Sequence, residues 1–157
     1  MIPAHGGRLI NRVAQGAQRQ ELLARAQKAA RVTLNSRETS DLEMLGSGAM
    51  SPLEGFMGSD DLRGVVTKSR LANGVVWPLP VTLSAKGAGP FHPGADLALH
   101  DESGAHLGLL ELQEVHSMPK NEEAQGCLGT TDATHPGVQY LGSIGDKYLA
   151  GPVWVLN

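Results

Sequence analysis

Apolar and polar positions in the first third of the chain alternate between patterns typical of helices and of strands. Residues 17–30 are rich in strong helix formers, with leucines and alanines on one side and cations elsewhere, which predicts an amphipathic helix. The run 32–34 then predicts a short strand. Asn35 and Glu38 have the spacing of a capping box, so a second helix should begin here and stop at Gly46, where a loop follows.

A third helix is predicted to begin at Ser59, whose side chain can cap it. Asp60 and Asp61 fall in the first turn and Lys68 near the last, as the helix dipole favours. Several apolar residues supply its buried face, and the Asn73-Gly74 pair marks a tight turn beyond its end.

The second half of the chain favours β structure. Residues 75–83 are apolar, and their two prolines exclude helix and confine any strand to a sheet edge. The runs 97–100 and 107–115 flank a polar turn and should pair as a hairpin. Residues 119–145 are punctuated by glycine, which indicates a long surface excursion rather than a packed element. Residues 148–156 predict a closing strand, so the fold class is α+β and β-rich.

Length and composition are those of one globular domain over residues 1–157. No stretch approaches the roughly 18 to 20 apolar residues of a membrane span, and the N-terminus has no signal-peptide layout. A single cysteine, Cys127, cannot form an internal disulfide, which fits a reducing compartment. We therefore expect a cytoplasmic protein with no membrane partner.

Charge is distributed unevenly along the chain. Residues 1–40 hold seven Lys or Arg against Glu21 and Glu38, a balance of +5, which leaves −8 for the remainder of a chain whose net charge is −3. A basic segment of this kind can bind nucleic acid. Its cations, however, have the spacing of solvated helix positions, and no aromatic residue interleaves with them for base stacking, so nucleic acid is not the expected partner.

Familiar catalytic and cofactor motifs are not recognisable in the sequence. The stretch Gly46-Ser47-Gly48 lacks the third glycine of a dinucleotide cradle, and Gly145-Asp146-Lys147 lacks the glycine spacing of a phosphate loop. Six histidines have no metal-ligand spacing, although His100 and His106 could approach each other across the predicted hairpin. We expect no catalytic residue, no cofactor site and no metal site in this chain.

Five segments together resemble the N-terminal region of ATP sulfurylases (sulfate adenylyltransferases). Ser51-Pro52-Leu53-Glu54-Gly55-Phe56-Met57 is similar to the Ser-Pro-Leu-x-Gly-Phe-Met signature of that family. The other four segments occur in the family's order: His5 to Arg12, Leu71 to Pro80, Gly129 to Val138, and Gly151 to Asn157. The resemblance implies a PUA-like pseudo-barrel with an N-terminal helix on its outside and short peripheral helices.

In the family that this resemblance indicates, a second domain of nucleotidyltransferase type joins ATP and sulfate into adenosine 5'-phosphosulfate and pyrophosphate. Its hallmarks, a Gln-x-Arg-Asn-Pro segment, paired histidines and a later Gly-Arg-Asp, do not occur here. The resemblance therefore implies a supporting domain that is inactive alone, with ATP and magnesium bound only when the catalytic domain is present. Whether a kinase domain also belongs to the parent protein is open.

Two motif loops are the candidate site residues, either for packing or for an interface with the catalytic domain. The first consists of Ser51, Pro52, Leu53, Gly55, Phe56 and Met57, and the second of Thr130, Thr131, Asp132, His135, Pro136 and Gly137. Leu53, Phe56 and Met57 are apolar and suit packing better than reaction, although docking of the catalytic domain is the alternative.

Two functions follow from these observations. The first is support of a sulfate adenylyltransferase catalytic domain, with a homo-oligomer as a further association. The alternative is a stand-alone PUA-like module that binds RNA through its basic N-terminal segment; the acidic remainder counts against it, because phosphate neutralisation dominates such binding.

Overall fold

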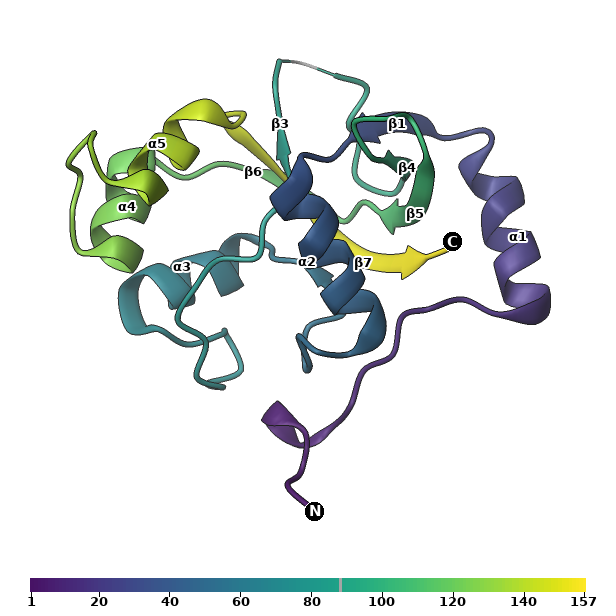
Figure 1. Cartoon of the computed structure of the whole chain (residues 1–157), viewed down its shortest axis with the longest axis horizontal. Helices are drawn as coiled ribbons and strands as arrows, with labels where there is room; N and C mark the ends of the chain where they lie inside the picture. The colour runs from purple at the N-terminus through teal and green to yellow at the C-terminus, as the bar shows by residue number, and fades with distance from the viewer. Residues whose placement is uncertain (88) are drawn as a thin grey trace.

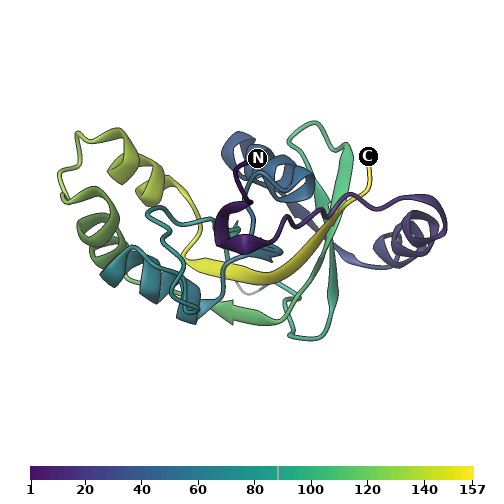
Figure 2. The ribbon, with the colours of Figure 1, turned by 90° about the horizontal axis from the view of Figure 1, so that it is seen from below.

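A long strand, β7 (Lys147–Val155), organises the sheet in the computed structural model, which describes residues 1–87 and 89–157. The first half of β7 pairs with β3 (Ser84–Ala85) and β6 (Glu114–His116), and the second half with β2 (Gly55–Phe56) and β5 (His106–Glu111), all antiparallel. Because β7 pairs along both edges, the sheet curls around it, and Figure 2 shows it as one curved strand that spans the molecule.

Two further strands extend the sheet beyond β5. β4 (Asp96–His100) pairs antiparallel with β5, and β1 (Ala30–Thr33) pairs parallel with β4. The main strand order is β1-β4-β5-β7-β2 in a seven-stranded sheet. This mixed sheet forms a half-barrel accompanied by helices, which confirms the predicted α+β, β-rich pseudo-barrel (Figure 1).

The first two helices follow the sequence pattern closely. α1 (Gly16–Ala26) packs Leu22 and Ala26 outside the sheet, against Ala98 and Leu109. It ends four residues before the predicted end at residue 30, because Ala30 already belongs to β1. α2 (Ser36–Ser47) opens with the predicted capping box and ends at Gly48, whose left-handed backbone (φ 85°) stops the helix.

The start of α3 (Ser59–Lys68) corrects one prediction. Gly58 is the N-cap, and the Ser59 side chain makes no capping hydrogen bond. Instead, the backbone N–H of Ser59 donates to the Glu114 carboxylate at 3.0 Å. A carboxylate from β6, 55 residues away, thus replaces the local cap that the sequence suggested.

The segment 119–145 was wrongly predicted as a surface excursion. It contains α4 (Lys120–Leu128) and α5 (Pro136–Ser143), which pack against each other, and α4 also packs against α3. Figure 1 places all three helices on one side of the molecule. Only the connection between α4 and α5 is an exposed loop.

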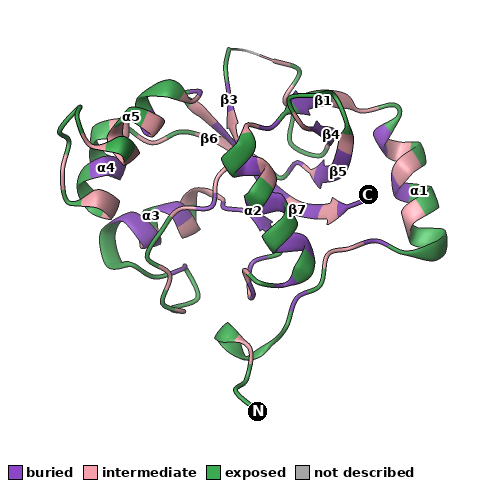
Figure 3. Ribbon diagram, in the orientation of Figure 1, coloured by how far each residue is buried: buried purple, intermediate pink, exposed green. Residues whose placement is uncertain are grey.

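Most of the core lies inside the half-barrel. Twenty buried side chains form one cluster between the sheet, α2 and the segment 53–57, and smaller clusters lie beneath α1 and between α3 and Tyr148. Figure 3 shows the buried positions concentrated along the strands and on the inner sides of the helices. In the described part of the chain, no helix is both long and apolar enough to cross a membrane.

Candidate functional site

Four of the five family-like segments meet in space. His5 shares a hydrogen bond with the Val76 carbonyl at 2.8 Å, and its ring lies 5.9 Å from that of Trp77. Farther along the N-terminal segment, the Ile10 N–H donates to the Ser51 hydroxyl at 2.8 Å. The N-terminal segment therefore lies across both the 51–57 loop and the 71–80 segment.

The 51–57 loop is fixed to the closing strand at its other end. Gly55 and Phe56 form β2 and pair with Gly151 and Pro152 of β7. A Cβ at Gly55 would collide with the Gly151 carbonyl oxygen, so only glycine permits this approach. The peptide bond before Pro52 is cis.

The apolar side chains of this loop are buried. Leu53, Phe56 and Met57 are 6%, 3% and 2% exposed and belong to the main core. Their packing matches the first of the two roles expected from the sequence. The role of the loop at an interface with another domain stays a prediction.

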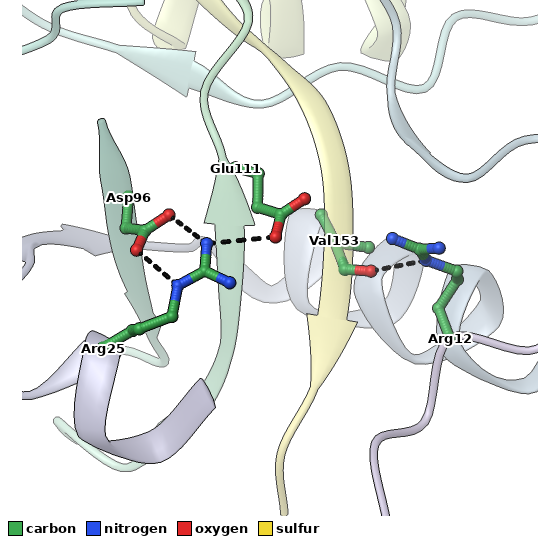
Figure 4. A network of polar contacts seen from close by, with 5 residues as sticks. All are labelled: Arg12, Arg25, Asp96, Glu111 and Val153. Carbon is green, nitrogen blue, oxygen red and sulfur yellow. Dashed lines mark hydrogen bonds and ion pairs between the residues drawn. The ribbon is translucent and has the colours of Figure 1, made fainter. Parts of the chain in front are cut away.

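Arg12 connects three of the motif segments. Its Nε donates to the Val153 carbonyl at 2.9 Å (Figure 4). Its guanidinium lies 3.7 Å from the centre of the Trp154 ring. The Glu54 carboxylate lies 3.9 Å from it. Burial lowers the pKa of Arg12, while the charges of Glu54 and Glu111 oppose that shift.

Other cations of the basic N-terminal segment also form hydrogen bonds with the sheet and with the residue after β7. Arg25 donates to Asp96 at 2.9 and 2.7 Å and to Glu111 at 3.0 Å, and these hydrogen bonds raise its pKa (Figure 4). Arg19 donates to the Leu156 carbonyl at 2.6 Å. The expectation that the cations of this segment are simply solvated is therefore wrong for Arg12, Arg19 and Arg25, and these contacts reduce the charge free for phosphates.

The second motif loop lies away from this convergence, between α4 and α5. Its hydrogen bonds are local: the Asp132 carboxylate accepts from the N–H and hydroxyl of Thr134, and the His135 ring caps α5 by accepting from Gly137 N–H. Thr131 and Asp132 are exposed. The structure thus does not bring the two predicted sets of site residues together.

An open cleft of about 410 Å³ lies beside the first motif loop. Three carboxylates line it, from Glu54, Asp61 and Glu114, and the described lining residues include no Lys, Arg or His. An anionic ligand such as sulfate or a triphosphate would meet repulsion there, since anion sites need converging cations or N–H donors.

The described residues contain no group of three or more His, Cys, Asp or Glu placed to hold a metal ion. The rings of His100 and His106 do approach across the hairpin, with centroids 4.9 Å apart, as expected. Burial raises the pKa of the Cys127 thiol to about 11, so this cysteine is a poor nucleophile near neutral pH.

Sequence reasoning missed Asp41. Its side chain is only 8% exposed, on α2, and burial raises its pKa to about 6. No motif or spacing marks this residue in the sequence. It lines a small cavity together with residues of α4 and α5, two helices that were not predicted.

Comparisons with known proteins agree with the geometry. The profile of a family described as a PUA-like domain matches residues 2–157. Proteins named sulfate adenylyltransferase from Symbiobacterium thermophilum and a Synechococcus strain are 46% and 48% identical over 158 residues. The chain is covered to 99% in both matches but spans only 40% of the length of these relatives.

A solved structure has a similar fold over nearly the whole chain. It is described as a hexameric APS kinase from Thiobacillus denitrificans, and it superposes with a TM-score of 0.73 at 28% identity. The superposition covers 99% of this chain and 27% of that one.

Proposed function

Because the chain belongs to the PUA-like domain family, we propose that it is the PUA-like part of a sulfate adenylyltransferase and supports that enzyme's catalytic domain. The observation that carries this proposal is the extent of the matches: nearly the whole chain aligns with proteins of that name, yet it spans 40% of their length. The groups that join ATP and sulfate would then belong to the remaining part of the enzyme.

The chemistry of the domain supports a structural role. Arg12 already binds a carbonyl and an aromatic ring, and Arg25 already binds a carboxylate. Carboxylates also line the cleft beside the motif loop. Neither arrangement suits a triphosphate. ATP and magnesium therefore bind only in the complete enzyme. A homo-oligomer of that enzyme is a compatible further association, since the structural neighbour is described as hexameric.

A graft into a relative tests the proposal. The 158 aligned residues of the Symbiobacterium protein are replaced by this chain, and formation of adenosine 5'-phosphosulfate is measured for the chimera, the parent and a truncated parent without those residues. We expect the chimera to recover activity that the truncated protein lacks. A folded chimera without activity, or a truncated protein as active as the parent, would contradict the supporting role.

A further inference from the structure

Two histidines face each other where the hairpin of β4 and β5 turns. His100 is the last residue of β4 and His106 the first of β5, and the two residues pair directly in the ladder. The register shifts between Leu99 and His100, because β5 contains one extra residue, Leu107, at this point. Without this bulge His106 would lie opposite Asp101. The extra residue thus brings the two imidazoles together.

The two rings have the separation that a shared metal ion requires. Their centroids lie 4.9 Å apart, and the ring planes make an angle of 32°. A zinc ion lies about 2.0–2.1 Å from an imidazole nitrogen, so two imidazoles bound to one ion have centroids about 4.5–5.2 Å apart at tetrahedral or right-angled geometry. The observed separation falls within that range, so the rings need not come closer to share an ion.

The hydrogen bonds of the two rings determine which nitrogens are free. Nδ1 of His100 lies 3.2 Å from the Ala98 carbonyl oxygen, and Nε2 of His106 lies 3.0 Å from that of Gly108. A carbonyl oxygen only accepts, so each of these nitrogens carries the proton of its neutral ring. The lone pairs therefore belong to Nε2 of His100 and Nδ1 of His106. Donation to a backbone carbonyl through the other nitrogen is how proteins orient histidine as a metal ligand.

Both lone-pair nitrogens are accessible from solvent. Neither has a hydrogen-bond partner among the described residues. The described side-chain atom that is buried without a partner is His116 Nδ1, so Nε2 of His100 reaches the surface although that residue is only 8% exposed. His106 is only partly buried. An ion can therefore approach both nitrogens from outside.

The surroundings of the pair select the class of ion. β1 places Arg31 opposite Ala98, on the same face of the sheet as His100, and its positive charge acts on His106. Among the described residues no third His, Cys, Asp or Glu joins the pair to form a larger metal site. Mg²⁺ and Ca²⁺ need oxygen ligands and would find none here. Imidazole nitrogens suit Zn²⁺, Ni²⁺ and Cu²⁺.

We propose that His100 and His106 form a surface site for one divalent transition-metal ion, with water molecules as its remaining ligands. The site lies on different elements from the two motif loops, and it does not depend on the proposed function. Bound there, the ion would hold the ends of β4 and β5 together beside their turn. Two protein ligands bind less tightly than the three or four of a dedicated zinc site, so the ion should be exchangeable.

Calorimetric titration of the chain with each ion alone tests the site. At pH 7.5 we expect one Zn²⁺ or one Ni²⁺ to bind per chain, and Mg²⁺ to give no binding. His106→Gln should weaken Zn²⁺ binding at least about tenfold, because the remaining imidazole loses a second ligand held close to it in the same chain. His100→Gln should have the same effect.

The matched control is His92→Gln, which removes an exposed histidine outside the pair and should leave the Zn²⁺ affinity unchanged. Circular dichroism establishes that each variant is folded. NMR of the imidazole nitrogens needs no variant: in the unmodified chain, Zn²⁺ should shift the resonances of His100 Nε2 and His106 Nδ1. Absence of Zn²⁺ binding, an affinity that His106→Gln leaves unchanged, or shifts confined to other histidines would overturn the inference and leave the proposed function untouched.

Discussion

The hydroxyl of Ser51 accepts a hydrogen bond from the Ile10 N–H at 2.8 Å and donates one to the Gly48 carbonyl at 2.7 Å. One buried side chain thus ties the N-terminal segment to the turn after α2 and to the start of the motif loop. The serine at this position of the family-like signature therefore has a structural role, because its hydroxyl forms hydrogen bonds with two backbone groups from different segments.

Ser51→Ala should therefore destabilise the chain. The substitution leaves the buried Ile10 N–H without its acceptor, which costs about 1–3 kcal/mol in the free energy of unfolding. Urea denaturation followed by circular dichroism measures it. Ser47→Ala is the control, because that hydroxyl is exposed and makes only a long local hydrogen bond of 3.3 Å. Equal effects of the two substitutions would contradict the role given to Ser51.

Gly55→Ala should be more damaging than its single methyl group suggests. The added Cβ would overlap the Gly151 carbonyl oxygen and lie 2.7 Å from the Cα of Pro152, and both are backbone atoms of β7 that cannot rotate away. Overpacking of this kind costs about 1–3 kcal/mol and sometimes more.

The control for Gly55 is Gly142→Ala in α5, where no atom beyond the adjacent residues and the backbone of the helix itself lies within 4 Å of the new Cβ. Alanine there should be neutral or should stabilise the helix by up to about 1 kcal/mol. Thermal unfolding of the two variants distinguishes them, and a melting temperature of Gly55→Ala close to that of the unmodified chain would show that β2 can move away from β7.

Asp41 predicts how the stability of the isolated chain depends on pH. Its pKa in the folded state is about 6, above the value of 3.8 in the unfolded chain, so the folded state holds this proton more tightly. The stability that this proton contributes is complete below about pH 4 and is lost as the pH rises to about 6. The loss is at most about 3 kcal/mol, given 1.36 kcal/mol for each pKa unit.

Asp41→Asn removes this proton. The unmodified chain should therefore lose stability relative to the variant as the pH rises from 4 to 8. Over this range the free energy of unfolding of Asp41→Asn minus that of the unmodified chain should increase by about 2–3 kcal/mol. Guanidinium titrations at both pH values measure it, with Glu43→Gln as the control. A difference that is the same at both pH values would contradict the raised pKa.

Local signals in the sequence were sufficient for some elements. The capping box of Asn35 and Glu38 needs only residues three positions apart, and the structure contains both of its hydrogen bonds. The hairpin of β4 and β5 follows equally from its turn, where Asp101 accepts hydrogen bonds from the N–H groups of Ser103 and Ala105. Interactions between residues a few positions apart can be predicted before the fold is known.

Elements that depend on distant partners were not predictable in this way. α4 buries Glu123 against Tyr148, 25 residues away, so the residue that anchors the helix looks like a solvated position. For α5 a local signal was present, since Pro136 occupies the first turn after the His135 cap, but it was interpreted as part of a surface excursion. Asp41 lines a cavity with residues of both helices, so its position could not be predicted without them.

The last prediction is that the isolated chain forms no adenosine 5'-phosphosulfate. Activation of sulfate needs cations and N–H donors that converge on several negative charges and on the leaving pyrophosphate. In a cavity of about 560 Å³ between β1, the start of α2 and the end of α5, Arg31 and Lys86 are opposed by Glu38 and Glu102. The cleft beside the motif loop offers carboxylates alone. A triphosphate would therefore find no excess of positive charge in either place.

The reverse reaction is the sensitive measurement, because it is the favourable direction. Adenosine 5'-phosphosulfate and pyrophosphate are mixed with the chain and magnesium, and ATP is detected by luminescence; we expect the signal of a heat-treated control. The unmodified Symbiobacterium protein, which is named a sulfate adenylyltransferase, serves as the positive control. ATP formation that follows the isolated chain through further purification would show that a site exists within it, and the supporting role would then be an incomplete account of this domain.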